Sequence, residues 1–386
     1  MKDPDYQSDN LKNENETKMK RAGNIFGDFA EMGNLRLAFK EFDKSKEDED
    51  YPDLVEFKKD PETELQKICK EVVTETYQPS GKYRRFVTWD SGKERIVDWN
   101  PVIKDGIIQH ALQQTAGQVL LRAGIRDTYS GIKGRGTHDG VKRVARFIRQ
   151  FNLDLMPLYI LKMDVRKFYA SIDLDLLKEK IRRKIKDKQI LRVYDLIIDS
   201  HPGGLPIGNY LSQHLANYFL SDYDQTIKAR GIKFYARYCD DIVAISSEKN
   251  ELKETKDFSI DYMKTIHLEI KENAQVFPIE RDGGLDFLGY NFYRHSIRLR
   301  KRNERSFRAA VDEFLKNPCP KTLHPLESYH GELKWTSHGE RLWNSLLHKP
   351  LKQLQQEVKN AEKHPRKHED RFPGRNTVGR AALAPA

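Results

Sequence analysis

The stretch "KFYARYCDDIVAIS", residues 233–246, sets two adjacent aspartates in the middle of an apolar, aromatic-rich run. The flanks around Tyr235 and Val243 have the composition of β-strands. Asp is rare inside strands and frequent in turns, so the run predicts a β-hairpin with Asp240 and Asp241 at its corner. Two acids side by side repel each other, so the corner needs a cation supplied from elsewhere.

A further acid, Asp164, ends the hydrophobic run 158–163 in "PLYILKMDVRKFYASID". Taken alone, such an Asp is most often a strand terminator or a helix cap. Carboxylates from two separate chain segments are, however, what two-metal chemistry uses to bridge ions about 4 Å apart. Mg²⁺ prefers hard oxygen ligands and completes its shell with substrate phosphates and water. We therefore expect Asp164 to lie beside the hairpin corner.

Composition limits the partners and the compartment. The chain has 386 residues, is 38% hydrophobic and carries a formal net charge of +10, which suits a large core and a polyanionic partner such as nucleic acid. Its three cysteines show no CxxC spacing, which fits a reducing compartment and argues against a zinc module. No run approaches the roughly 18 apolar residues of a membrane span, and the N-terminus is polar. We expect a cytoplasmic protein without a membrane partner.

The order of elements is mixed, which predicts an α+β core followed by a helical C-terminal part. Periodicity predicts helices over 24–42, 55–76, 101–125, 141–149, 174–186, 190–200, 209–230 and 250–266, and strands at 83–99, 158–165 and 276–293. In "GGLPIGNYLSQHLANYFL", the Gly/Pro turn feeds an amphipathic helix that Asn209 begins. Whether Ser212 and Gln213 also face a substrate stays open at this stage.

Four segments together resemble the palm motifs of reverse transcriptases in order and spacing. They are "LKMDVRKFYASID", "GLPIGNYLSQHLANYFL", "YARYCDDIVAIS" and "LDFLGYNFY", and the resemblance covers roughly residues 80–300. The third contains the family's Tyr-x-Asp-Asp box, residues 238–241. The resemblance implies an α+β right-hand polymerase fold with fingers, palm and a short helical thumb. The implied division is an arm (1–20), an N-terminal extension with fingers (21–157), a palm (158–293), a thumb (294–370) and a tail (371–386).

The resemblance also implies roles for individual residues. Asp164 and Asp240 match the principal metal ligands, Asp241 the third carboxylate, and Val165 a ligand through its backbone carbonyl. Tyr169 matches the steric gate that excludes a ribonucleotide 2′-hydroxyl, the alternative being an ordinary core aromatic. The other implied dNTP-binding residues are Lys93, Arg95, Ile207, Gly208 and Gln213, and the implied primer grip is Phe287, Leu288, Gly289 and Tyr290. Lys271 matches a general acid for the leaving pyrophosphate, or is a plain surface lysine.

Basic residues outside these motifs are candidates for contacts with the nucleic-acid backbone. They are Lys133 and Arg135 in a Gly-rich loop, Lys142, Arg146 and Arg149 on the following helix, and Arg300, Lys301 and Arg302 near the C-terminal part. The alternative is a solvated basic face. The helix over 141–149 has an apolar stripe of Val141, Val144, Ala145 and Ile148, which we expect to be buried. The implied cofactors are two Mg²⁺ ions, with Mn²⁺ as a substitute, and the implied partners are dNTPs, an RNA template and its cDNA. Whether the chain acts alone, as a homo-oligomer or with an accessory protein stays open.

The second motif departs from the common family form. Where many reverse transcriptases have Gln-Gly-x-x-x-Ser-Pro, residues 207–213 read Ile-Gly-Asn-Tyr-Leu-Ser-Gln, which resembles the enzymes of diversity-generating retroelements and of a compact prokaryotic cluster. Cys239 in the box is unlike the Met expected of that group. The interpretation favoured here is copying of a dedicated structured non-coding RNA into cDNA in antiphage defence. The alternatives are mutagenic copying by a diversity-generating retroelement and, more remotely, a non-catalytic RNA-binding, maturase-like protein; an RNA-dependent RNA polymerase and a DNA-binding repressor are weaker rivals.

Overall fold

The computed structural model describes residues 21–44, 52–90, 93–151, 156–280, 283–347 and 352. The predicted arm (1–20) and tail (371–386) lie outside this described part. The chain divides into two compact units, Met1–Ile297 and Arg298–Ala386.

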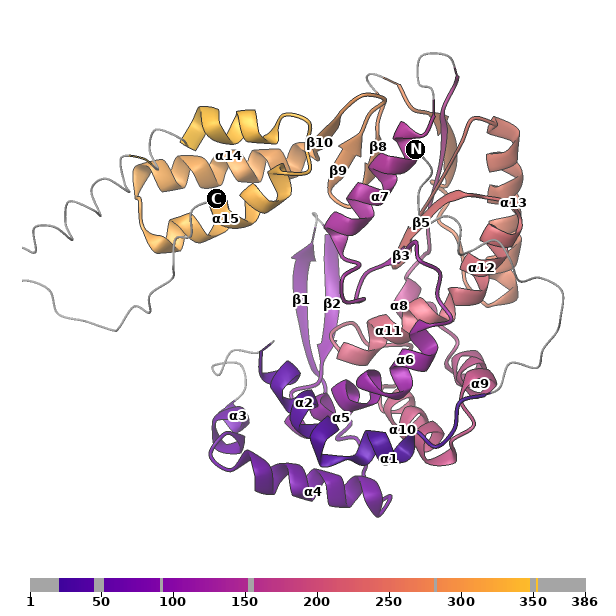
Figure 1. Ribbon diagram of the computed structural model, residues 1–386, viewed down its shortest axis with the longest axis vertical. Coiled ribbons are helices and arrows are strands. Elements are labelled where there is room, and N and C mark those ends of the chain that lie inside the picture. Colours follow the sequence, from indigo (N-terminus) through magenta and orange to yellow (C-terminus); the bar gives the residue numbers. More distant parts are fainter. Residues whose placement is uncertain are drawn as a thin grey trace, which may run out of the picture. The chain divides into compact units, whose positions relative to one another are not determined.

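The central element of the first unit is a five-stranded sheet (Figure 1). Its strand order is β3-β5-β6-β4-β7, with bounds β3 Thr128–Tyr129, β4 Tyr159–Asp164, β5 Phe234–Tyr238, β6 Asp241–Ser246 and β7 Gln275–Pro278. Strands β5, β6, β4 and β7 are antiparallel to their neighbours, and β3 is parallel to β5. Strands β4 and β6 lie inside the sheet and are paired on both sides, and β6 is buried over Ile242–Ser246.

Two further antiparallel pairs belong to this unit. The strands β1 (Arg84–Asp90) and β2 (Lys93–Trp99) are antiparallel, in the register Val87↔Ile96. The pair β8 (Leu285–Phe287) and β9 (Tyr290–Phe292) follows β7, so 276–293 contains parts of three strands rather than two. The prediction of paired strands over 83–99 is confirmed.

The helices that precede residue 122 gather around α5, whose residues 107–113 are all buried, whereas α7 packs against β3 and β5 (Figure 1). The bounds are α1 Phe26–Ala30, α2 Met32–Asp43, α3 Pro52–Phe57, α4 Pro61–Val73, α5 Ile103–Gln114, α6 Ala116–Leu121 and α7 Thr137–Arg149. The predicted apolar stripe of α7 is confirmed, since Val141, Val144, Ala145 and Ile148 are all buried. The helices around α5 fix the base from which the β1–β2 hairpin extends.

The remaining helices of the first unit are α8 Phe168–Ser171, α9 Leu174–Lys184, α10 Lys188–Asp199, α11 Tyr210–Phe219, α12 Ser221–Ala229 and α13 Lys249–Thr265. Four segments that the sequence predicts as single helices each contain two helices, so that part of the prediction was wrong. They are 24–42, 55–76, 101–125 and 209–230. In 209–230 the break falls at Leu220, which is fully buried with ψ near 3°. A buried apolar residue preserves the helical pattern through a break, so periodicity alone does not reveal it.

The second unit begins inside the short strand β10 (Ile297–Leu299) and contains α14 (Lys301–Lys316) and α15 (Pro320–Leu333), followed by a helical segment over 339–347. Aromatic side chains hold these helices together. The Trp343 ring stacks on His330 with centroids 4.2 Å apart, and Phe307, which is fully buried, lies 6.2 Å from Trp343. Within the described residues, none of the helices combines the length and apolar character needed to cross a membrane.

Candidate active site

The two adjacent acids lie at a two-residue hairpin turn between β5 and β6. Tyr238 pairs with Asp241 across the hairpin, so Cys239 and Asp240 form the turn itself. Cys239 has φ +57°, a conformation that residues other than Gly adopt with a cost. The turn therefore needs stabilising contacts from the surrounding fold.

A buried arginine supplies one of these contacts. Arg237 is 0% exposed, and its Nη1 donates to the Cys239 carbonyl at 2.8 Å. Its Nε and Nη2 hold both carboxylate oxygens of Asp224 on α12 at 2.8 and 2.6 Å. Asn217 on α11 accepts from the same guanidinium through its side chain and its carbonyl, and donates to the Ser130 carbonyl at 2.7 Å. The turn between β5 and β6 is thus anchored to α11, α12 and the Gly-rich loop.

Asp164 lies directly beside this turn. It ends β4 in register with Asp241 of β6, and the Val165 N–H donates to the Asp240 carbonyl at 3.2 Å. The segment before β7 lies beside the end of β4, since the Lys271 N–H donates to the Asp164 carbonyl at 2.9 Å. The Lys271 ammonium lies 2.5 Å from Asp164 Oδ1. Lys271 is therefore in the carboxylate cluster, which the sequence alone left undecided.

The environment disfavours the charged forms of the turn acids. Burial, followed by the negative charge of Asp164, raises the pKa of Asp240, while Lys271 and Arg95 lower it in part. Burial also raises the pKa of Asp241 to about 6, against the opposing effect of Lys162. Three carboxylates lie close together here, and burial limits their contact with water. Such a cluster of incompletely solvated acids is typical of a functional site.

The raised pKa of Asp241 gives a prediction for stability. Because the folded chain holds this proton up to about pH 6 and an unfolded Asp releases it near pH 3.9, stability is lost as pH rises through this window. Asp241→Asn removes the ionisation, so we expect it to raise the free energy of unfolding at pH 7 by on the order of 1–2 kcal/mol. The measurement is urea unfolding of both proteins in a chelator at pH 4, 5, 6 and 7. The gain should shrink towards pH 4, and a variant that is less stable at every pH would contradict the assignment.

Tyr169 lies on α8 against the turn between β5 and β6. The Cys239 thiol donates to its hydroxyl at 3.1 Å, and burial raises the pKa of the Tyr169 phenol. Its carbonyl accepts from the Leu205 N–H at 2.9 Å. A Cβ on Gly204, which has φ +52°, would lie 2.7 Å from the backbone of Tyr169 and Ala170. The Gly/Pro turn thus needs glycine at 204 because it packs directly on the backbone of the gate candidate.

Other candidates for the nucleotide site come from β2 and from the loop before α11. Arg95 is exposed on β2, and its charge acts on Asp240. Lys93 begins β2, and its side chain lies outside the described part. The Ile207 carbonyl accepts from the Asp98 N–H at 2.9 Å, and Gly208, with φ +118°, packs against β2.

The second motif divides between surface and interior. Ile207 is 37% exposed, whereas Ser212 is 4% exposed and cannot face a substrate in this arrangement. A Cβ on Gly131 would lie 2.6 Å from the Gln213 side chain, so that side chain packs on the Gly-rich loop. Asn209 is the N-cap residue of α11, as expected, although its side chain donates to the Tyr83 hydroxyl rather than to the helix.

The predicted primer grip is a tight turn between β8 and β9. Leu288 and Gly289 have φ +57° and +86°, as a two-residue hairpin turn with both central residues at positive φ requires. Phe287 and Tyr290 flank the turn and are buried. The Leu288 side chain packs on Gly140 of α7, where a Cβ would lie 2.6 Å from Leu288 Cδ1.

The basic candidates divide between the two units. Lys133 in the loop and Lys142, Arg146 and Arg149 on α7 are exposed, while Arg135 is half-buried and donates to the Ile125 carbonyl at 3.1 Å. Arg300, Lys301 and Arg302 stand at the start of α14 in the second unit. The first group therefore shares a unit with the carboxylates.

Two groups in this site were missed by the sequence analysis. Lys162 lies two residues before Asp164 on β4 and contacts Asp241, and the Arg237 network holds the turn. The alternation of a strand puts residues two apart on one face, so Lys162 could have been found from its spacing to Asp164. Arg237 could also have been found from the sequence, because it is a charged residue in an otherwise apolar strand and lies two positions before Cys239.

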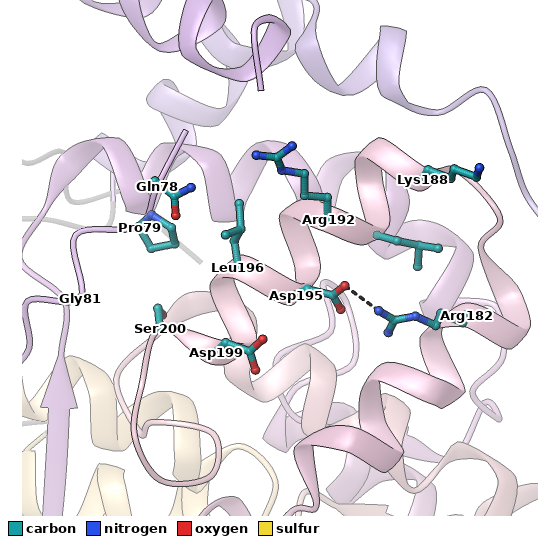
Figure 2. Close-up of a pocket in the computed structure, with 11 residues that line it drawn as sticks. Gln78, Pro79, Gly81, Arg182, Lys188, Arg192, Asp195, Leu196, Asp199 and Ser200 are labelled. Carbon is teal, nitrogen blue, oxygen red and sulfur yellow. Dashed lines mark hydrogen bonds and ion pairs between the residues drawn. The ribbon is translucent and has the colours of Figure 1, made fainter. Parts of the chain in front are cut away.

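A cavity of about 510 Å³ lies elsewhere, between the loop 78–81 and helices α9 and α10 (Figure 2). Its lining includes Arg182, Lys188, Arg192, Asp195 and Asp199, and none of the site candidates. Figure 2 shows Arg182 paired with Asp195, at 2.6 Å. Arg192 is likewise paired with Glu75, at 2.8 Å. These charges compensate one another, so the cavity does not define an anion site.

Comparison with known proteins identifies the family. A family profile described as reverse transcriptase (RNA-dependent DNA polymerase) matches residues 96–292, just over half of the chain. The chain belongs to the reverse transcriptase family. The family is described as RNA-dependent DNA polymerases, which are nucleotidyltransferases, and the mixed α+β architecture of the chain is the right-hand polymerase fold that the sequence predicts.

Solved structures similar to this reverse transcriptase include telomerases. Apo telomerase from Candida tropicalis matches at 14% identity and TM-score 0.43, over 65% of this chain and 56% of that chain. Telomerase from Candida tropicalis with a TWJ fragment of telomeric RNA matches at 15% identity and TM-score 0.47, over 77% of this chain and 58% of that chain. Telomerase from Candida albicans with such a fragment matches at 12% identity and TM-score 0.45, over 69% of this chain and 56% of that chain. The chain thus spans less than two thirds of those telomerases, and no curated protein matches its sequence.

The carboxylates of this reverse transcriptase fit a divalent cation, as its family uses. The Oδ1 atoms of Asp164 and Asp241 are buried and make no hydrogen bond of acceptable geometry. Hard carboxylate oxygens are suitable ligands for such a cation, which would relieve the repulsion between the acids. Within the described residues no group of three or more His, Cys, Asp or Glu side chains is already arranged as a metal site. Lys162 and Lys271 supply the positive charge at these oxygens.

Proposed function

We propose that this chain copies an RNA template into DNA by nucleotidyl transfer at the cluster of Asp164, Asp240 and Asp241. The observation that carries the proposal is the register Asp164↔Asp241, which brings acids from two strands together at the turn that contains Asp240. In this proposal Asp164 and Asp240 hold two Mg²⁺ ions, with Asp241 and the Val165 carbonyl completing the set. The chemistry that such ions would supply there is activation of the primer 3′-hydroxyl and neutralisation of the triphosphate.

The remaining steps belong to side chains around the cluster. Arg95 on the exposed hairpin, together with Lys93, offers positive charge to the triphosphate. Lys271 Nζ gives a proton to the departing pyrophosphate, a role supported by its 2.5 Å contact with Asp164. The turn Phe287–Tyr290 holds the primer end, and Ile207, Gly208 and Gln213 complete the surroundings of the nucleotide.

Contacts to the nucleic-acid backbone complete the proposed binding surface. The exposed face of α7 with Lys142, Arg146 and Arg149 serves the duplex together with the loop residues Lys133 and Arg135. Arg300, Lys301 and Arg302 are a separate set of proposed backbone contacts within the second unit. Binding through phosphates predicts an affinity that falls steeply with salt.

The steric gate gives a direct test of the choice of sugar. In Tyr169→Ala the ring no longer fills the space beside Cys239, so we expect the preference for dNTP over rNTP in kcat/KM to fall about 10- to 100-fold, the range for losing one well-packed group. The measurement is single-nucleotide extension of a primer on RNA with matched dNTP and rNTP.

The matched control for the gate is Tyr169→Phe. It keeps the ring and loses only the hydroxyl that accepts from Cys239, so the preference should persist. Equal preference in the wild type and Tyr169→Ala would assign Tyr169 to the core instead, and efficient rNTP use by the wild type would favour an RNA polymerase.

For the biological role we propose copying of a dedicated structured non-coding RNA into cDNA in antiphage defence, by an enzyme of the compact prokaryotic cluster. The form of residues 207–213 supports a second candidate, mutagenic copying by a diversity-generating retroelement. Sequencing the co-purified RNA and its cDNA, with and without phage infection, tests both. Phage-dependent copying of one adjacent RNA supports defence, and adenine-specific errors in the cDNA support the retroelement.

A further inference from the structure

Lys162 occupies a central position that none of the motif residues explains. It lies on β4, the strand between β6 and β7, with the buried residues Leu161 and Met163 on either side. It lies two positions before Asp164 on the strand, so both side chains lie on one face of the sheet. Its side chain is 25% exposed, so its ammonium group is partly removed from water.

The ammonium of Lys162 joins two parts of the site that belong to different sheets. Its Nζ lies 2.7 Å from each carboxylate oxygen of Asp241, at the start of β6. The same Nζ donates to the Asp286 carbonyl of β8 at 2.7 Å, and it lies 5.1 Å from the centroid of the Phe287 ring. Phe287 is the last residue before the Leu288–Gly289 turn. The Lys162 ammonium thus contacts both Asp241 in the carboxylate cluster and β8, the strand that leads into the Leu288–Gly289 turn.

The chemistry of lysine suits such a bridge. An ammonium has three donors around one compact charge, and here the partners are a carboxylate, a backbone carbonyl and an aromatic face. Because the carbonyl belongs to the backbone, the contact fixes the path of β8 itself rather than one side chain. A methionine would fill the same space but would make none of the polar contacts, and the planar guanidinium of arginine has a different reach.

We propose that Lys162 is a positioning residue that holds the Phe287–Tyr290 turn at a fixed distance from Asp241. The inference rests on the proposed function, in which this turn holds the primer end and the carboxylates direct its attack. A displacement of about 1 Å between reacting groups costs on the order of 100-fold in rate, so the bridge acts on turnover rather than on affinity.

The first test compares Lys162→Met with the wild type in primer extension. We expect kcat to fall about 10- to 100-fold, with KM for dNTP and Kd for primer–template within about 3-fold, because alignment and not binding is lost. Lys249→Met is the matched control, since Lys249 is exposed and its ammonium lies 5.8 Å from the Tyr159 ring at the other end of β4. It should keep the wild-type kcat.

Two further readouts separate positioning from a loss of structure. Hydrogen exchange in a chelator should become faster in peptides covering 283–292 of Lys162→Met and should stay unchanged in those covering 84–99. In a double-mutant cycle with Asp241→Asn, the double variant should be no slower than the slower single variant, because both changes break one bridge.

Each outcome bears on one claim. Extension by the wild type and by Lys249→Met supports the proposed function independently of Lys162. Given that extension, an unchanged kcat in Lys162→Met, fully additive effects in the cycle, or a rise in KM alone would overturn the positioning role. Uniformly faster exchange throughout the chain would also overturn it, in favour of a purely structural lysine.

Discussion

Asp240→Asn is expected to abolish DNA synthesis, lowering kcat by about 10³-fold or more, since a metal-binding carboxylate contributes several kcal/mol to the transition state. Asp240 sits in the two-residue turn beside Asp164, and its repulsion with that acid is part of what raises its pKa. The variant loses the negative charge but keeps the shape, so the fold should persist. The measurement is single-turnover incorporation of a dNTP on an RNA template with Mg²⁺.

Asp241→Asn is the informative comparison for this result. Asp241 is tied to Lys162, whereas Asp240 presents its carboxylate at the turn, so we expect a smaller loss from Asp241. Asp257→Asn, an exposed carboxylate of α13 away from the cluster, should keep full activity. Near-normal incorporation by Asp240→Asn, with wild-type binding of primer–template, would refute the assignment of the metal site.

The second large effect concerns stability. Arg237→Met is expected to lower the free energy of unfolding by about 3–5 kcal/mol, the usual cost of breaking a buried ion pair from one side. Both Arg237 and Asp224 are fully buried, and Asp224 would keep only the Tyr235 and Thr128 hydroxyls as partners. The Cys239 carbonyl would also lose its donor, so the turn at φ +57° would be less well held. Urea unfolding in a chelator measures the change.

The control for this prediction is an exposed pair. Arg183 contacts Glu179 at 2.9 Å on the surface of α9, and Arg183→Met should cost less than about 0.5 kcal/mol. The double variant Arg237→Met with Asp224→Leu should recover part of the loss, because no buried charge is left unpaired. A change below about 1 kcal/mol in Arg237→Met would show that water or movement compensates for the lost pair.

The local pattern of the chain was enough for several parts of the fold. Alternation and turn residues predicted the β1–β2 hairpin and the strand ending at Asp164, and the apolar stripe of α7 lies inside as expected. Continuity of helices was predicted less well, because apolar residues such as Leu220 keep the helical spacing where the backbone breaks. The family resemblance is supported by the profile match over 96–292.

What the sequence by itself determined is the set of acids and the hairpin that carries two of them. A strand-forming run with Asp240 and Asp241 at its centre can hardly form anything but a hairpin whose corner carries both carboxylates. Only the tertiary structure decided which cations meet these acids. Lys162 reaches Asp286 across 124 residues of sequence, and Lys271 meets Asp164 through pairing at the edge of β4. Such contacts depend on which distant strands pair and on how separate sheets pack together, and local periodicity specifies neither.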